Sequence, residues 1–160
     1  MSRLPLSPAF TFIELLIVLI VIGVFIALAI PQIGKAYDGF LLDDAVKDVY
    51  YIARYLQESA ITKGLPHRLA IAIDKEKCTL SGFARNGTVD IPIEGRINKV
   101  YTVPEALTFS VEFDNQPEAK NDVFFYPDGS SDTARLRFQN KHQRQAAVCI
   151  NGTQGEITIE

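Results

Sequence analysis

The chain has no tryptophan, a single methionine and only two cysteines among its 160 residues. Cys78 and Cys149 are too few for a disulfide scaffold and do not have the spacing of a metal site. We expect no metal and no cofactor. The net charge is only −3, which indicates no strongly basic face and makes nucleic acid an unlikely partner. No compositional bias indicates disorder.

The motifs that carry catalysis are missing too. The sequence has no G-x-S-x-G, H-E-x-x-H or P-loop pattern, which would mark common hydrolase, metalloprotease and nucleotide sites. Its two histidines, His67 and His142, stand among basic or polar residues that we expect to form loops. A catalytic base needs a nucleophile and an orienting carboxylate beside it. The sequence therefore predicts a protein that is not an enzyme.

One long apolar run is present near the N-terminus. Residues 10–30 read FTFIELLIVLIVIGVFIALAI, and about twenty apolar residues are enough to cross a bilayer as a helix. Arg3 precedes the run and favours a cytoplasmic N-terminus, whereas Lys35 follows it and favours the opposite orientation. We predict a membrane-spanning helix over 10–30.

Glu14 is the one charged residue in this run and distinguishes three interpretations. The first is a plain membrane anchor, and the second is a secretory signal cut after Ala27-Leu28-Ala29, which would leave a chain that begins at Ile30. Neither gains from a carboxylate in the helix, which costs roughly 2.5–3.5 kcal/mol at mid-bilayer. The third is a leader that is cut after Ala9. Such a chain benefits from Glu14, because this carboxylate can neutralise the new amine of Phe10 on a neighbouring helix. Glu14 therefore favours a leader over residues 1–9 and assembly through the helix.

The N-terminal segment resembles the signature of type IV pilins and type II secretion pseudopilins. The resemblance rests on Ala9-Phe10-Thr11-Phe12-Ile13-Glu14-Leu15-Leu16-Ile17-Val18-Leu19. It implies cleavage between Ala9 and Phe10 by a prepilin peptidase of the inner membrane, which also methylates the new N-terminus. The family usually has glycine where this chain has Ala9. Gly23 and Pro31 stand where pilins carry helix-weakening residues.

After Pro31 the helical pattern continues to about residue 64. Apolar residues recur every three to four positions, which predicts one face of an amphipathic helix. Gly64 and Pro66 should end it, and Pro31 should kink it because proline has no backbone N–H. The predicted stripe consists of Tyr37, Leu41, Ala45, Val49, Ile52, Leu56 and Ala60.

From Arg68 onward the apolar period changes to two, which predicts antiparallel strands separated by tight turns. We expect two small sheets whose apolar face covers the helix. The predicted strands are Arg68–Asp74, Lys77–Phe83, Asn98–Val103, Thr108–Phe113, Val123–Tyr126, Ala134–Gln139, Ala146–Asn151 and Glu156–Glu160.

Three segments of this half resemble the H-type minor pseudopilins and the minor pilins of the FimU and FimT kind. The segments are residues 57–66 (QESAITKGLP), 125–131 (FYPDGSS) and 155–159 (GEITI). The resemblance implies a tip-proximal subunit of the type II secretion pseudopilus, which supports protein export. A minor pilin for pilus assembly or DNA uptake is an alternative, and a secreted β-domain with a signal peptide is a second.

The remaining polar motifs have simple structural explanations. Asn86-Gly87-Thr88 and Asn151-Gly152-Thr153 match the glycosylation pattern, but Asn-Gly is typical of turns. We expect Asp128 to act in a turn with Gly129 rather than to bind a metal with Asp122 and Asp132. The basic residues Lys141, His142 and Arg144 predict a solvated loop. Cys78 and Cys149 either pair or remain two separate thiols, and we favour separate thiols.

The sequence thus predicts an α+β, pilin-like chain in four parts. A leader (1–9) precedes the transmembrane and filament-core helix (10–30), its amphipathic continuation (31–64) and a β-rich globular domain (65–160). We expect a single-pass protein of the inner membrane whose C-terminal domain is periplasmic. Its expected partners are other pilins or pseudopilins, the prepilin peptidase and membrane lipid.

Overall fold

The computed structural model describes residues 11–74, 77–93, 100–114 and 121–160. Side chains at 29–33 lie outside this description. The chain divides into two units, Met1–Tyr37 and Asp38–Glu160, and each is described by itself.

One long helix, α1, occupies Phe12–Lys63, and its helical assignment is continuous through Pro31. It ends as predicted, because Gly64 takes a φ of 65°. Glycine adopts this left-handed conformation without the steric cost that other residues meet, and such a residue commonly follows the last helical turn. The kink expected at Pro31 stays a prediction.

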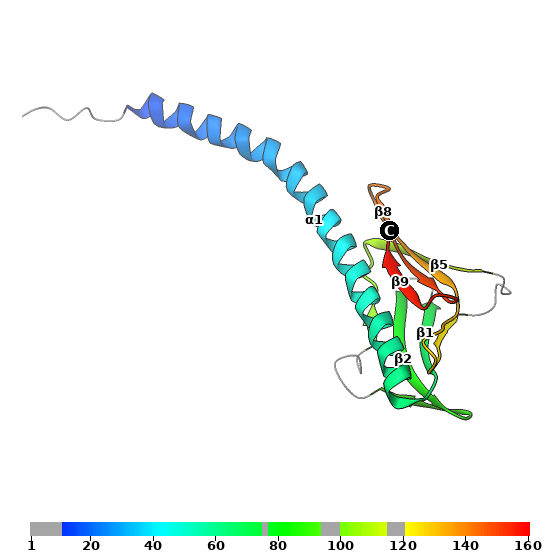
Figure 1. Ribbon diagram of the computed structural model, residues 1–160. Helices are drawn as coiled ribbons and strands as arrows, with labels where there is room; N and C mark the ends of the chain where they lie inside the picture. Colours follow the sequence, from blue (N-terminus) through cyan, green and yellow to red (C-terminus); the bar gives the residue numbers. More distant parts are fainter. Residues whose placement is uncertain (1–10, 75–76, 94–99, 115–120) are drawn as a thin grey trace, which may run out of the picture. The chain divides into compact units, whose positions relative to one another are not determined.

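The rest of the described chain is antiparallel sheet (Figure 1). In the first sheet the strand order is β3-β2-β1-β6, and β4 pairs with β2 beside β3. In the second sheet the order is β5-β7-β8-β9. The strands are β1 (His67–Asp74), β2 (Lys77–Asn86), β3 (Val89–Pro92), β4 (Tyr101–Thr102), β5 (Leu107–Phe113), β6 (Asp122–Phe125), β7 (Ala134–Asn140), β8 (Gln145–Asn151) and β9 (Glu156–Ile159).

The period-two pattern of the sequence predicted the ends of most of these strands to within one or two residues of the observed ends. The prediction missed β3, which is four residues long, ends in Pro92 and lies at a sheet edge. Proline removes a ladder donor and weakens the strand signal, yet it is tolerated at an edge. The strand predicted over Asn98–Val103 is only two residues long in the described region, and 98–99 lie outside it.

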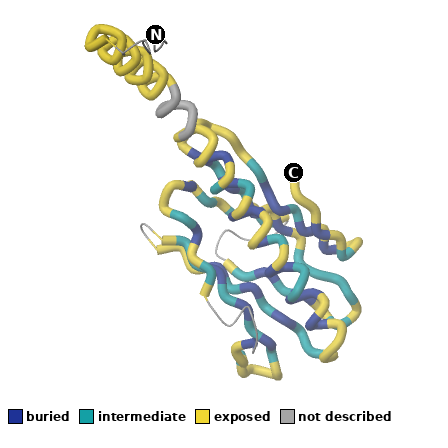
Figure 2. The backbone as a smooth tube through the Cα atoms, turned by 90° about the vertical axis from the view of Figure 1, so that its left-hand side faces the viewer, coloured by how far each residue is buried: buried dark blue, intermediate teal, exposed yellow. Residues whose placement is uncertain are grey.

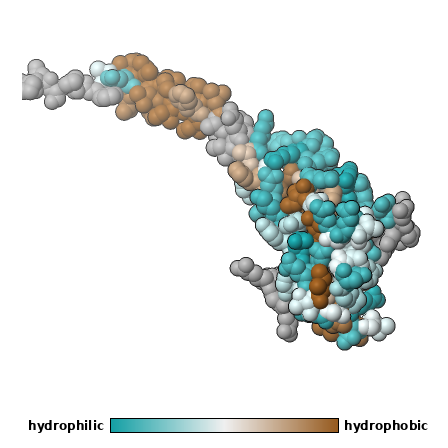
Figure 3. Space-filling model, viewed as in Figure 1, coloured by the Kyte–Doolittle hydropathy of each residue, from teal (hydrophilic) through white to brown (hydrophobic). Residues whose placement is uncertain are grey.

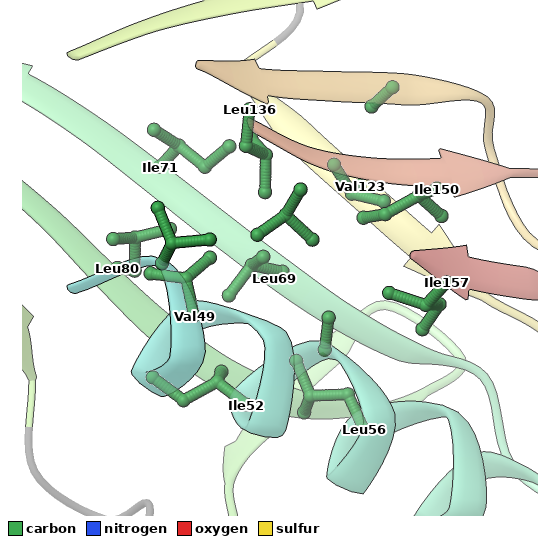
Figure 4. Close-up of a cluster of buried hydrophobic side chains, with 14 of the residues drawn as sticks. Val49, Ile52, Leu56, Leu69, Ile71, Leu80, Val123, Leu136, Ile150 and Ile157 are labelled. Carbon is green, nitrogen blue, oxygen red and sulfur yellow. The ribbon is translucent and has the colours of Figure 1, made fainter. Parts of the chain in front are cut away.

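A single hydrophobic cluster joins the C-terminal half of α1 to both sheets (Figure 4). Val49 and Leu56 of the helix, Leu69 of β1 and Leu136 of β7 are fully buried. Burial of each such side chain is worth about 1.5–3 kcal/mol, so the helix and the sheets stabilise one another. Buried and exposed positions alternate along this part of α1 (Figure 2).

The helical stripe is rotated from the predicted one at its beginning. Tyr37 is 65% exposed and Leu41 only half-buried, whereas Leu42 and Val46 are buried. The predicted stripe stepped by four residues from Tyr37, and steps of four drift around a helix of 3.6 residues per turn. From Ala45 to Ala60 the predicted positions are buried as expected.

Candidate assembly interface

The N-terminal half of α1 presents an apolar surface. Every described residue from Thr11 to Leu28 is exposed, and the exposed fractions of Phe12, Leu19 and Phe25 are 80%, 62% and 68%. Figure 3 shows this surface as a continuous brown segment. Soluble monomers rarely expose contiguous apolar patches of such extent, which are typical of sites that contact membrane or other chains.

No helix among the described residues is long and apolar enough to cross a membrane.

Thr11 caps the beginning of this helix. The backbone N–H of Glu14 donates to Thr11 O at 3.1 Å and approaches Thr11 Oγ1 at 3.4 Å. Thr11 is therefore the N-cap and Glu14 the third helical residue, which is the spacing of a capping box. This role of Thr11 was not predicted, although the T-x-x-E pattern of residues 11–14 is its sequence signal. Glu14 also lies at the positive end of the helix dipole, so its carboxylate has a local benefit of about 0.3–1 kcal/mol.

The structure describes only some of the residues predicted to act in processing and assembly. Ala9 and Phe10 lie outside the described residues, so no contact between Glu14 and Phe10 is described. Glu14 is exposed in the first helical turn. Gly23 lies within the helix, and a Cβ atom added there would meet nothing within 4 Å. Pro31 is part of the helix.

The two cysteines are free and belong to different sheets. Cys78 packs against the core from β2, and burial raises the pKa of its thiol to about 11. Cys149 lies in β8 between the buried Val148 and Ile150, so it points to the opposite, outer face. There its sulfur accepts a hydrogen bond of 3.3 Å from Arg135 Nε. The disulfide considered from the sequence is absent from this structure.

The three segments that resemble minor pilins meet at Gln57. This side chain is 5% exposed, and its Nε2 donates to Gly129 O at 3.1 Å and to Gly155 O at 2.6 Å. Both glycines have positive φ, 88° and 61°. A Cβ on Gly155 would lie 2.4 Å from Gly129 O, which explains why no larger residue fits. Gln57 thus joins the helix to two loops distant in sequence.

The basic loop between β7 and β8 is exposed, as predicted for a solvated loop, and its side chains also clamp α1. Lys141 Nζ and His142 Nε2 lie 2.9 and 3.0 Å from Asp38 Oδ2. Arg144 Nη2 contacts both carboxylate oxygens of Asp43 at 3.0 and 3.3 Å. The hydrogen bond from Lys141 is the main cause that holds the pKa of the buried Asp38 below its usual value. These cations pair with carboxylates of their own chain, and nucleic acid as an unlikely partner stays a prediction.

His67 also differs from expectation, because it is fully buried in β1 rather than placed in a polar loop. Its Nδ1 donates to Leu65 O at 2.8 Å, and no partner of Nε2 is found among the described residues. Burial is the main cause that lowers the pKa of this imidazole. His67 is a neutral core residue at the junction of α1 and β1. His142 lies in a loop as predicted.

The three aspartates around β6 act separately. Asp122 pairs with Arg68 at 2.8 Å, and Asp132 Oδ2 accepts from the backbone N–H of Phe124 at 3.1 Å. Asp128 accepts from Ser130 N at 2.9 Å within the predicted turn. No cluster that could hold a metal ion occurs among the described residues.

Comparison with solved structures identifies the fold. The minor pseudopilin EpsH of the type 2 secretion system of Vibrio cholerae matches with a TM-score of 0.60 at 17% identity, over 74% of this chain and 95% of that chain. The type IV minor pilin FimU of Pseudomonas aeruginosa matches with a TM-score of 0.52 at 15% identity, over 74% and 87%. No protein-family model and no curated protein sequence matches the chain. At these identities the likeness establishes a pilin-like fold.

Proposed function

We propose that this pilin-like chain is a minor pseudopilin, a tip-proximal subunit of the type II secretion pseudopilus that supports protein export across the outer membrane. The observation that carries the proposal is the contrast between the two halves of α1. The C-terminal half buries one face in its own domain, whereas the N-terminal half exposes an apolar surface over residues 12–28. Such a surface needs lipid before assembly and neighbouring helices after it.

The chemistry of the N-terminus supports the same proposal. Residues 1–9 are a leader that a prepilin peptidase removes, and Phe10 then carries a free, methylated amine. Residues 10–30 anchor the chain in the inner membrane, with the β-domain in the periplasm. In the assembled filament Glu14 pairs with the Phe10 amine of a neighbour, because opposite charges attract strongly where water is excluded. The chain has no enzymatic role in this proposal.

A type IV minor pilin is the second candidate, favoured by the likeness to FimU. The same helix chemistry would serve either machine, and the two candidates differ in their partner subunits. A secreted β-domain with a cleaved signal is a third candidate. The mass of the mature chain distinguishes it from the two pilin-like candidates. Mass spectrometry of protein from its native membrane should give a methylated chain that begins at Phe10. A chain that begins at Ile30 would support the secreted domain instead.

Substitutions of Glu14 test the assembly role. We expect Glu14→Ala and Glu14→Gln to insert, be cleaved and keep a folded β-domain, but to lose cross-linking to partner pilins. Removal of one member of a buried ion pair typically costs about 3–5 kcal/mol. Glutamine is the sharper variant because it also serves in capping boxes, so the helix start is retained while the charge is lost.

Thr11→Val is the matched control. It removes the capping hydroxyl, preserves the shape of the side chain and leaves the Glu14 carboxylate in place. We expect it to assemble like the wild type. If Thr11→Val lost assembly as completely as Glu14→Gln, helix capping would explain the phenotype. If Glu14→Gln assembled normally, the intersubunit ion pair would be refuted.

A further inference from the structure

The C-terminal half of α1 carries an exposed stripe on the side away from the core. The stripe consists of Phe40, Asp44, Asp48 and Tyr51, and all four residues are exposed. Phe40 is 73% exposed and Tyr51 65%. Residues three and four apart share one face of a helix, so the two carboxylates lie between the two aromatic rings. We call this set the acidic–aromatic stripe.

The stripe is unfavourable for the isolated chain. Asp44 and Asp48 are four residues apart, and like charges at this spacing destabilise a helix. Partial burial and the charge of Asp44 raise the pKa of Asp48. Burial, then Asp48 and Asp44, raise the pKa of the neighbouring Tyr101 to about 12. Within the described residues neither carboxylate forms an ion pair, although Lys47 lies on the same part of the helix.

The chemistry of the stripe matches a cationic partner. A guanidinium group stacks on an aromatic face and pairs with a carboxylate at the same time, and it is weakly hydrated enough to do so at an interface. Exposed aromatic rings provide the contact area from which interface energy arises. An arginine-bearing surface would therefore satisfy both the charges and the rings of the stripe.

The partner is better explained by a different subunit than by a second copy. The chain has a net charge of −3, so two copies repel. Five of its basic side chains are already in ion pairs with its own carboxylates, namely Arg68, Arg135, Arg137, Lys141 and Arg144. Arg85 stacks over the ring of Phe124. Arg54 donates to Gln57 Oε1 at 3.3 Å, so every arginine among the described residues is already engaged within its own chain.

We propose that the acidic–aromatic stripe is a docking surface for an arginine-bearing face of a different filament subunit. This inference rests on the proposed function and names the partner chemistry at the C-terminal half of α1. In the proposed filament the apolar half contributes packing and the Glu14 ion pair, neither of which distinguishes one pilin-like subunit from another. The stripe adds specificity, because it favours a basic neighbour and repels another acidic copy.

Site-specific photo-crosslinking of the full chain in its native membrane tests the proposal. Tyr51 is replaced by p-benzoylphenylalanine in one strain, and Ile20 is replaced by the same probe in a second. We expect the probe at 51 to give an adduct whose cross-linked peptide contains arginine and belongs to another subunit with a pilin-like N-terminus. Asp44→Lys with Asp48→Lys should reduce this adduct at least tenfold.

The matched control is Glu105→Lys with Glu156→Lys, which makes the same change in net charge at two exposed residues outside the stripe. It should leave the adduct unchanged. An adduct with a second copy, with lipid alone or with a peptide that lacks arginine would overturn the proposal, as would insensitivity to the two lysine substitutions in the stripe. The probe at Ile20 separates the two hypotheses. If it cross-links to pilin-like subunits while position 51 does not, docking fails and the filament role stands. If neither position does, both fail.

Discussion

Gln57 Nε2 donates a 2.6 Å hydrogen bond to the carbonyl oxygen of Gly155, which lies 98 residues further along the chain. The same amide group donates to Gly129 O, so one helical side chain fixes two turns. Those turns lead from β6 towards β7 and from β8 to β9. The contact explains why three short motifs that look like simple helix-end and hairpin chemistry occur together.

We predict that Gln57→Leu destabilises the β-domain by about 1–3 kcal/mol. The substitution keeps a similar volume but leaves two carbonyl groups without their donor. A fully buried unsatisfied group costs about 1–3 kcal/mol, and these two are only part-buried, so water can replace part of the loss and we expect their combined cost to stay in this range. Urea unfolding of the full chain in detergent, followed by circular dichroism, measures it. Glu58→Gln, at the exposed neighbouring position, should change stability by less than about 0.5 kcal/mol. Equal stability of the Gln57→Leu variant and the wild type would contradict the structural role.

The buried imidazole of His67 predicts a loss of stability in mild acid. Its pKa is lowered in the folded chain, so below about pH 6.5 the unfolded chain binds a proton that the folded chain resists. Stability is therefore complete above that pH and falls as the pH drops towards the folded pKa. Between pH 7.5 and 5.5 the loss should reach at most about 1.4 kcal/mol.

His67→Asn provides the comparison for this pH effect. Urea midpoints at the two pH values should differ in the wild type and differ less in the variant, whatever its absolute stability. The lowered pKa of Asp38 acts below about pH 4, outside this interval. A pH dependence that is the same in both proteins would show that His67 is not its origin.

The ion pairs of Asp38 with Lys141 and His142 should stabilise the helical turns of α1 that begin the second unit, Asp38–Glu160. Asp38→Asn removes the charge that Lys141 and His142 contact, and we expect faster amide exchange at Leu42 and Val46. Arg144→Ala should have a smaller effect, below about 1 kcal/mol, because its ion pair with Asp43 is largely exposed. Hydrogen exchange of the full chain in detergent measures both variants. Equal exchange in Asp38→Asn and the wild type would rule out the clamp.

Gly23 predicts a weak segment in the apolar half of α1. Alanine is favoured over glycine in a helix by about 0.8–1.0 kcal/mol, and the site has room for a Cβ atom. Gly23→Ala together with Pro31→Ala should therefore slow amide exchange over residues 24–30 in detergent. If exchange there is already as slow as in the flanking turns, and the double variant changes nothing, the weak segment does not exist.

The amino-acid sequence by itself determined the long helix, the change to strands after Gly64 and most strand positions. These features depend on periodicity and turn chemistry, which act within a few residues. It also placed Glu14 in the apolar run and supported the assembly hypothesis, which stays a prediction. The missed β3 shows the limit of local patterns, since a strand's place at a sheet edge is set by pairing with distant segments. The rotated stripe at Tyr37 instead reflects helix geometry, because steps of four residues drift around a helix of 3.6 residues per turn.

Tertiary structure decided the contacts between distant segments. The meeting of Gln57 with Gly129 and Gly155, the clamp of Lys141 on Asp38 and the burial of His67 depend on how strands pair and where the helix lies on them. The cysteines illustrate the reason most simply. Successive residues of a strand point to opposite faces, so a shift of one position moves every side chain to the other face. Only the pairing of β8 with β7 and β9 put Cys149 on the outer face, away from Cys78.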